Sequence, residues 1–275
     1  MKIAFTKMQG TGNDYIYIDA CRCPVAEPES LAKRLSDRHF SVGADGLVLI
    51  LPSDKADLRM RMFNADGSEA QMCGNAARCV ARYAVDHGLV ENDDFTLETM
   101  AGIKHLHVSR SNGIVSSVRV DMGEPVIKTM DSTADCLLAQ SGVVRLFAHD
   151  FTLVDMGNPH AVCFVKDVES FPVHTLGAQV ENHPLFPLRT NVEFVELVDS
   201  EHLCMRVWER GTGETLACGT GACASAVAAI SKGMAQRNLS LRVLGGELQV
   251  CWDSQTHHVF LQGPANYCFE GTVQL

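Results

Sequence analysis

The chain has 275 residues, 46% of them hydrophobic and 20% charged, a composition typical of a globular protein with enough residues for two hydrophobic cores. Its formal net charge of −10 argues against nucleic-acid binding, which needs a basic surface. The longest apolar runs, such as Leu47–Leu51, are too short to span a membrane, and Met1–Phe5 lacks the apolar stretch of a signal peptide. We therefore expect a cytoplasmic protein that binds neither nucleic acid nor a membrane.

The cysteine pattern argues against a disulfide framework. The chain holds eleven cysteines, an odd number, and no Cys-x-x-Cys pair. Because the apolar fraction is normal, we interpret most of them as small buried residues in a reducing compartment. Cys21 and Cys23 form a Cys-x-Cys, a weak metal signal, but a surface loop before Pro24 is the favoured interpretation. We predict no metal site.

The first half of the chain reads as strands around two helices. A helical pattern over Pro28–His39 is predicted to place Leu31 and Leu35 on one face. The same face is expected to include Phe40. Strands are predicted, in chain order, at Lys2–Met8, Tyr15–Asp19, Gly46–Leu51, Leu58–Phe63, Phe95–Met100 and Ile103–Ser109.

The second half repeats this order. An alanine-rich helix is predicted in each half, over Asn75–His87 and Thr220–Lys232, and each ends at a glycine suited to left-handed backbone. Alanine on several faces is typical of a buried helix. The predicted strands of the second half lie at Phe151–Asp155, Asn191–Leu197, Met205–Trp208, Leu239–Leu244 and Glu247–Trp252.

Identical residues recur 145 positions apart. The pairs are Gly12-Asn13 with Gly157-Asn158, Met60-Arg61 with Met205-Arg206, Glu69 with Glu214, Cys73-Gly74 with Cys218-Gly219, Ala77 with Ala222, and Gly88 with Gly233. We interpret this as an internal duplication that gives an α+β fold of two pseudo-symmetric domains, each with strands wrapped around a central helix. The predicted domains are residues 1–121, to which residues 263–275 are expected to return, and residues 122–262.

A Cys-Gly pair stands before the central helix in each half. The first N–H groups of a helix have no partner within it, and the dipole is positive at that end. Such an end binds a carboxylate and favours the thiolate of a neighbouring cysteine. One thiolate, at Cys73 or Cys218, could remove a proton from a carbon while the other thiol returns one to the opposite face. That chemistry inverts the carbon without a cofactor.

A structural cysteine is the alternative interpretation at either position taken alone. The matched register of Cys73 and Cys218 favours chemistry over that alternative. Cys79 and Cys223 do not share a register inside the helices, and we expect both to be core residues.

Five stretches resemble the diaminopimelate epimerase family. They are Lys7–Asp14, Phe63–Glu69, Cys73–Asn75, Gly157–His160 and Trp208–Ala222. The resemblance implies a pyridoxal-independent, two-base epimerase that interconverts LL- and meso-diaminopimelate on the route to lysine and peptidoglycan. It places Cys73 and Cys218 on the two catalytic cysteines. It places substrate contacts on Asn13, Asn64, Gly74, Asn75, Asn158, Asn191, Glu209, Arg210, Gly219 and Thr220.

The residue types fit a substrate with a charged group at each end. Arg210 could grip a distal carboxylate in bidentate fashion, and Glu209 could meet the distal ammonium. The two could instead form a surface ion pair. Asn64 could serve only its turn and Asn191 only a strand cap, and His160 could either assist proton exchange or stabilise a turn. A family position that often holds glutamine falls on Gly46.

Three other functions remain open at this point. A proline or hydroxyproline racemase would share both cysteines but would need no distal clamp such as Arg210. An isomerase of the same fold that works without cysteine would not need Cys73 and Cys218. A non-enzymatic amino-acid binding protein would not need paired thiols either. The oligomeric state is open, with a homodimer as one expectation.

Overall fold

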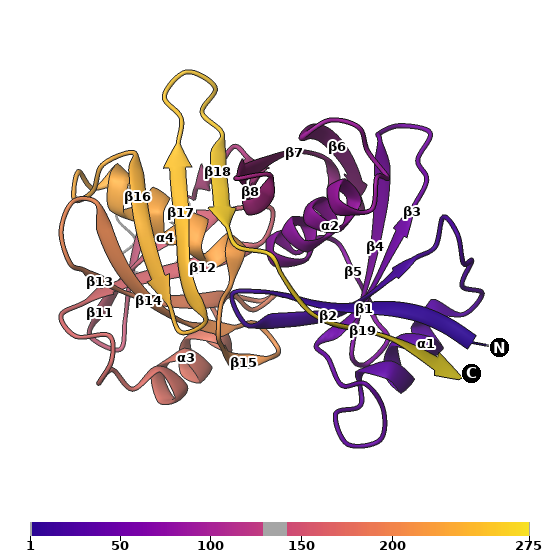
Figure 1. Ribbon diagram of the computed structural model, residues 1–275. Coiled ribbons are helices and arrows are strands. Elements are labelled where there is room, and N and C mark those ends of the chain that lie inside the picture. Colours follow the sequence, from indigo (N-terminus) through magenta and orange to yellow (C-terminus); the bar gives the residue numbers. More distant parts are fainter. Residues whose placement is uncertain (1, 129–141, 275) are drawn as a thin grey trace. The chain divides into compact units, whose positions relative to one another are not determined.

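The computed structural model describes residues 2–128 and 142–274, which belong to two compact units (Figure 1). Unit 1 comprises Met1–Asp121 and Gln262–Leu275, and unit 2 comprises Met122–Leu261. No helix among the described residues is both long and apolar enough to cross a membrane.

Unit 1 is built on one mixed sheet. Its elements are β1 (Lys2–Gly10), β2 (Asn13–Asp19), α1 (Pro28–Ser36), β3 (Gly46–Leu51), β4 (Leu58–Asn64), β5 (Glu69–Ala70), α2 (Gly74–Asp86), β6 (Asp94–Thr99), β7 (Gly102–Ser111), β8 (Ile114–Gly123) and β19 (Asn266–Gln274). Strand β1 pairs antiparallel with both β2 and the final strand β19. The pairs β2–β3 and β4–β6 are parallel, so each needs a crossover, and these crossovers contain α1 and α2.

Unit 2 has the same plan. Its elements are β9 (Val126–Ile127), β10 (Val143–Leu146), β11 (His149–Asp155), β12 (Pro159–Val165), α3 (Val173–Glu181), β13 (Asn191–Leu197), β14 (His202–Glu209), β15 (Gly213–Thr215), α4 (Gly219–Ser231), β16 (Asn238–Val243), β17 (Gly246–Trp252) and β18 (Val259–Gly263). Here the parallel pairs are β12–β13 and β14–β16, and their crossovers contain α3 and α4.

The strand register confirms the predicted duplication. Tyr15 lies opposite Gly46 in the β2–β3 pair, and His160 lies opposite Asn191 in the β12–β13 pair, 145 residues later in both strands. The helices α2 and α4 each have 13 residues, and they begin at Gly74 and Gly219, which are also 145 apart. The predicted α+β fold of two copies is therefore correct.

The central helices are buried, as their alanine content predicts. Every residue of α4 from Ala222 to Ala229 is fully buried, and the helix contacts β11–β14, β16 and β17. Helix α2 contacts β1, β2 and β7. The predicted glycine follows the C-cap residue of each helix, Gly88 with φ 64° and Gly233 with φ 69°, a conformation that favours glycine.

Strand β13 has helices on both of its faces, and this placement matters for the site. Val192 and Phe194 pack into one core with residues of α3. Glu193 points to the other face, where its Oε1 lies against Gly221 of α4. Because successive side chains of a strand alternate between faces, a strand covered on both sides buries nearly every residue.

Two expectations about the outer helices were wrong. Helix α1 ends at Ser36 instead of His39, and Phe40 is 92% exposed rather than on the buried face. The Asp37 carboxylate accepts the N–H groups of His39 and Phe40 at 2.8 and 2.9 Å, a local turn that competes with the helix. The sequence patterns also did not predict α3.

Candidate active site

Both cysteines begin a central helix in the same way. Cys73 and Cys218 have extended backbones, with φ −138° and ψ 123° at the first and φ −121° and ψ 115° at the second. The first intrahelical bond runs from Ala77 N to Cys73 O and from Ala222 N to Cys218 O, at 2.9 Å in both. Each side chain therefore lies at the positive end of its helix.

Asn13 joins Cys73 to an acid that the sequence patterns did not indicate. The Cys73 thiol donates to Asn13 Oδ1 at 3.4 Å, and Asn75 Nδ2 donates to the same oxygen at 3.5 Å. Asn13 Nδ2 donates to Asp45 Oδ2 at 2.7 Å. Because a carboxylate only accepts, Asp45 fixes the Asn13 amide with its oxygen toward the thiol.

Basic side chains compensate the acids beside this group. Arg38 Nη2 lies 2.7 Å from Asp14 and 2.9 Å from Asp45, and Lys7 lies 2.8 Å from Asp14. Burial raises the pKa of Asp14, but the hydrogen bonds from Arg38 and Lys7 outweigh it and hold that pKa below its usual value. Asp14 is therefore ionised at neutral pH and belongs to the frame that holds Asn13.

Arg78 of α2 supports the site from inside unit 1. Its side chain is fully buried, and Nη2 donates to Asn75 Oδ1 at 2.8 Å. Its Nε donates to Pro264 O at 3.2 Å. Because the guanidinium only donates, it fixes the Asn75 amide with its nitrogen toward Asn13.

Asn64 and Gly46 lie opposite each other where β3 and β4 meet. Asn64 Nδ2 donates to Ser68 Oγ at 3.0 Å, so the turn role considered for Asn64 is present. A Cβ at Gly46 would lie 2.0 Å from Phe63 O, so no side chain fits there unless the strand shifts. This chain cannot use a glutamine at that position in the present backbone.

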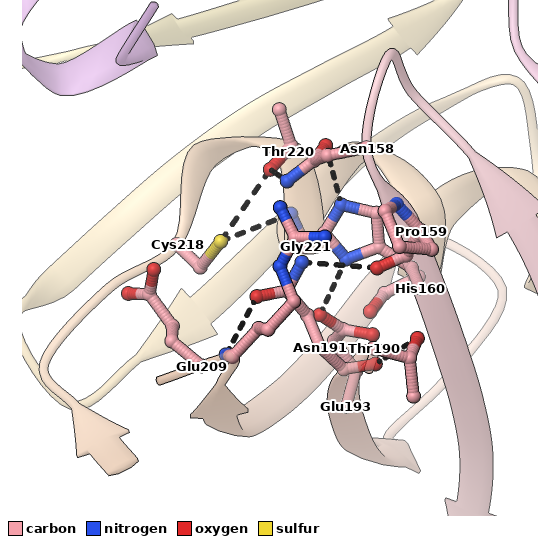
Figure 2. A network of polar contacts seen from close by, with 12 residues as sticks. Asn158, Pro159, His160, Thr190, Asn191, Glu193, Glu209, Cys218, Thr220 and Gly221 are labelled. Atoms are coloured by element: carbon pink, nitrogen blue, oxygen red, sulfur yellow. Dashed lines mark hydrogen bonds and ion pairs between the residues drawn. The ribbon is translucent and has the colours of Figure 1, made fainter. Parts of the chain in front are cut away.

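Figure 2 shows the polar network around Cys218, all of it within unit 2. The Sγ of Cys218 accepts the Gly221 N–H at 3.4 Å and lies 3.5 Å from Thr220 Oγ1. Asn158 Nδ2 donates to Thr220 Oγ1 at 3.3 Å. Cys218 is 7% exposed, whereas Cys73 is partly exposed.

A buried histidine and glutamate continue this network. The Nε2 of His160 lies 3.0 Å from Asn158 Oδ1, and its Nδ1 lies 2.7 Å from Glu193 Oε1 (Figure 2). The side chains of His160 and Glu193 are both fully buried. His160 is thus part of a side-chain network that reaches Cys218 through Asn158 and Thr220, rather than a residue that serves only its own turn.

Burial and two nearby carboxyl groups make Cys218 a weak acid. Burial raises its pKa well above the usual value, and the nearby charges of Glu209 and Glu193 raise it further. Hydrogen bonds from Thr220 and Gly221 act in the opposite direction. The Glu209 carboxyl accepts the hydroxyl of Thr215, and burial followed by the charge of Glu193 raises its own pKa despite that bond.

Asn191 and Arg210 form a second contact in unit 2. Asn191 Oδ1 accepts the Arg210 N–H at 2.9 Å, and its Nδ2 donates to Pro159 O at 2.9 Å. Both ends of the Asn191 amide therefore bind backbone, which agrees with its structural interpretation. Arg210 Nη1 donates to Leu188 O at 3.3 Å. Glu209 is bonded to Thr215 rather than to Arg210, so the surface ion pair considered for these two does not describe them.

The predicted residues thus gather in two groups. Unit 1 brings Asn13, Gly74 and Asn75 to Cys73, and unit 2 brings Asn158, Glu209, Gly219 and Thr220 to Cys218. Sequence patterns missed Asp45, Arg78, Thr215 and Glu193. The one signal available was Glu193 itself, an acid inside an apolar strand where the first repeat has Val48. Among the described residues, no group of three His, Cys, Asp or Glu side chains could hold a metal ion.

Solved structures of racemases and related proteins share this fold. A probable proline racemase from Agrobacterium radiobacter has a TM-score of 0.71 and 17% identity, over 99% of this chain and 92% of that one. A Bacillus anthracis phenazine biosynthesis protein of the PhzF family has a TM-score of 0.71 and 19% identity over the full length of both. At these identities the likeness concerns the fold alone.

The sequence comparisons are more specific. The profile of the diaminopimelate epimerase family matches residues 5–128 and 152–268. Diaminopimelate epimerase of Acetivibrio thermocellus is 50% identical over 98% of both chains, and that of Phocaeicola vulgatus is 49% identical over 99% of both. The chain belongs to the diaminopimelate epimerase family.

Proposed function

We propose that the protein interconverts LL- and meso-diaminopimelate by moving the α-proton between two thiols without a cofactor. Family membership supports the substrate. The observation that carries the chemistry is the matched geometry of Cys73 and Cys218, each at the start of a buried helix with the same first hydrogen bond. Two identical groups suit a reaction that runs in both directions between mirror-related centres.

The proposed reaction has two proton transfers. The thiolate of one cysteine takes the α-proton, and the electron pair of the broken C–H bond moves onto the substrate carboxylate. The thiol of the other cysteine then gives its proton to the opposite face of the carbon. The thiol and thiolate have exchanged roles, and the next turnover in reverse uses them the other way round.

The helix ends would stabilise the charge that builds on the carboxylate. Backbone N–H groups ahead of the first intrahelical bond, such as those of Gly74 and Gly219, are suited to an oxyanion. They cost no rearrangement because the helix already holds them in place. An α-proton of an amino acid is a very weak acid, so this stabilisation is the largest demand that the mechanism makes of the protein.

Charged and amide side chains would recognise the two charged ends of diaminopimelate. The Arg210 guanidinium, bonded only through Nη1 to Leu188 O at 3.3 Å in the described contacts, would pair with the distal carboxylate. Asn191 would act by holding the Arg210 backbone. The Glu209 carboxylate would accept a hydrogen bond from an ammonium group. The remaining proposed contacts are Asn13, Asn64, Asn75, Asn158 and Thr220.

The test compares diaminopimelate with proline. Purified protein is incubated with LL-diaminopimelate or with L-proline, and the stereoisomers are separated by chiral chromatography. We expect LL-diaminopimelate to be converted to the meso isomer until the two stereoisomers reach equilibrium. We expect no D-proline to form. Turnover of proline with little turnover of diaminopimelate would contradict the proposed substrate, while the two-thiol chemistry would still require its own test.

A further inference from the structure

Glu193 is an unusual residue for the interior of a sheet. Its side chain is fully buried, its Oε1 lies 2.7 Å from His160 Nδ1, and its Oε2 has no hydrogen-bond partner among the described residues. Burying a carboxyl group with an unsatisfied oxygen destabilises a fold. The first repeat avoids this cost, because Val48 occupies the equivalent position in β3 and is fully buried. The fold itself therefore does not need an acid here.

Helix α4 carries a matching change. A Cβ on Gly221 would lie 2.7 Å from Glu193 Oε1, which is too close. The equivalent residue of α2 is Ala76, which has that Cβ and is fully buried. The repeats thus differ at two facing positions: the strand has valine in the first and glutamate in the second, and the helix has alanine in the first and glycine in the second. The two differences together make room for a carboxyl group directly beneath the network of Cys218.

The hydrogen bonds of this network can be followed from His160 outward. Acceptor oxygens face both ring nitrogens of His160, Glu193 Oε1 at Nδ1 and Asn158 Oδ1 at Nε2, an arrangement that suits a ring with a proton on each nitrogen. Asn158 Nδ2 then donates to Thr220 Oγ1. The hydroxyl proton of Thr220 is left to point at Cys218 Sγ, 3.5 Å away. Without an acceptor at Nδ1 the ring could lose the proton on that nitrogen or turn over, and the order would be lost.

We propose that Glu193 is a positioning residue that holds the His160 ring through Nδ1, and so orders the hydrogen bonds that run through Asn158 and Thr220 toward the sulfur of Cys218. The proposal rests on the proposed function of Cys218 as a proton donor and acceptor. Glu193 itself would touch no substrate, because it lies wholly beneath the residues that do. Its effect on the reaction would pass through His160.

The ionisation of Cys218 alone cannot test this role, because Glu193 affects the sulfur in two opposite ways. Its negative charge raises the pKa of Cys218, whereas the hydrogen bond from Thr220 that it helps to order lowers that pKa. Removal of Glu193 changes both. The His160 ring gives a direct readout, since an imidazole N–H bonded to a carboxylate gives a proton resonance far downfield and protected from exchange.

The experiment uses the full-length protein labelled with ¹⁵N in histidine. Three variants are compared with the wild type: Glu193→Gln, Glu193→Val, and Glu193→Val combined with Gly221→Ala, which copies the first repeat and refills the space. The matched control is Glu196→Gln on the same strand, whose carboxylate accepts the Val168 N–H at 3.0 Å outside the network. His160→Gln assigns the ring signal, and thermal unfolding confirms that each variant folds.

We expect a downfield ring proton in the wild type and in Glu196→Gln that is absent from His160→Gln and from both Glu193→Val variants. In Glu193→Gln it should move upfield, because an amide oxygen is a weaker acceptor than a carboxylate. Loss of the downfield signal should accompany a fall in kcat of about tenfold or more for the double variant, with a change in KM below about threefold.

Several outcomes would overturn the role of Glu193. They are a wild type without the signal, a signal that survives Glu193→Val, or a double variant with the kcat of the control. Failure of the wild type to epimerise diaminopimelate would instead contradict the proposed function, and the ring signal would still report on the positioning of His160.

Discussion

Cys73 and Cys218 begin their helices with the same backbone geometry, but the charges buried around them differ. Behind Cys73, Asn75 is held by the fully buried cation of Arg78, where α4 has Cys223. Near Cys218 lie the fully buried carboxyl group of Glu193 and the half-buried one of Glu209, where unit 1 has Val48 and Asn64. The duplicated fold gives both sulfurs equivalent positions, and side chains that differ between the repeats give them different surroundings.

This difference bears on how two identical groups can do unlike work. Epimerisation needs a proton acceptor and a proton donor at the same moment. Burial and two neighbouring acids raise the pKa of Cys218 and thereby favour its protonated form at neutral pH. An internal duplication therefore supplies the pair, and the unequal buried charges can bias which member holds the proton.

The largest expected effect tests whether both copies are needed. We predict that Cys73→Ser and Cys218→Ser each lower kcat by about a thousandfold or more, because serine is too weak an acid to donate or accept the proton. Circular dichroism should show a folded protein in both cases. The measurement is the rate of meso-diaminopimelate formation. Near-normal turnover by either variant would mean that only one repeat carries the chemistry.

Oxidation tests whether the two sulfurs act at one carbon. If both reach the same atom they must approach closely, so air oxidation of the substrate-free protein should join Cys73 to Cys218 and abolish activity. Dithiothreitol should restore the activity fully. Mass spectrometry of the unreduced protein should detect the crosslinked peptides. Sulfinic acid alone, or oxidation confined to Cys21 and Cys23, would argue against a shared carbon.

Arg210 is a difference between the two units, because only unit 2 has an arginine at this position. The equivalent residue in unit 1 is Ala65, so a distal clamp made by arginine would come from unit 2 alone. Arg210→Lys keeps the charge but loses the planar fork, and kcat/KM for LL-diaminopimelate should fall about tenfold or more. Arg210→Ala should fall further, and neither should gain activity on L-proline. Unchanged kinetics in the lysine variant would remove the bidentate role.

The smallest expected effect concerns the acidity of Cys218. A raised pKa means a smaller thiolate fraction at a given pH, so iodoacetamide should modify Cys218 slowly at about pH 8 and faster as the pH rises. Glu209→Gln removes an adjacent negative charge, which should lower that pKa and speed the alkylation about threefold or more. Peptide mass spectrometry follows the reaction.

Glu214→Gln is the control for that substitution, because the Glu214 carboxylate binds Arg206 at 2.7 Å instead of lying beside the thiol. It should leave the alkylation rate of Cys218 unchanged. If both glutamine variants accelerated alkylation equally, the effect would come from loosening of unit 2 and not from the charge of Glu209.

The repeat explains why much of the backbone could be predicted. The predicted strands over Gly46–Leu51 and Asn191–Leu197 match β3 and β13 at both ends. The strand register also shows that the spacing between equivalent residues falls from 145 to 144 after the central helix. Leu58 of β4 lies opposite Leu97 of β6, and the equivalent pair in unit 2 is Leu203 of β14 with Leu241 of β16. Apolar patterns and helix-ending glycines are local signals, and duplication shows each of them twice.

The supporting charges of the site could not be predicted in the same way. Glu193 and Arg78 are charged residues in the protein interior, where such residues are rare. A prediction based on the pattern of polar and apolar residues therefore places them on the surface. Asp45 accepts a hydrogen bond from Asn13, which is 32 residues away in the sequence, and no local sequence pattern predicts that contact. Only a comparison of the two repeats, position by position, sets Glu193 against Val48 and marks it as a residue that the fold does not require.

The most direct test of the two-thiol mechanism is the fate of hydrogen in deuterated water. LL-diaminopimelate is incubated with the enzyme, and product and remaining substrate are analysed by mass spectrometry at low conversion. A thiol carries a single proton, so two separate thiols predict that the meso product carries one deuterium at the inverted carbon while recovered LL substrate keeps its original hydrogen. Product that retains the original hydrogen, or substrate that gains deuterium as fast as product forms, would mean that one group serves both faces and would contradict the mechanism.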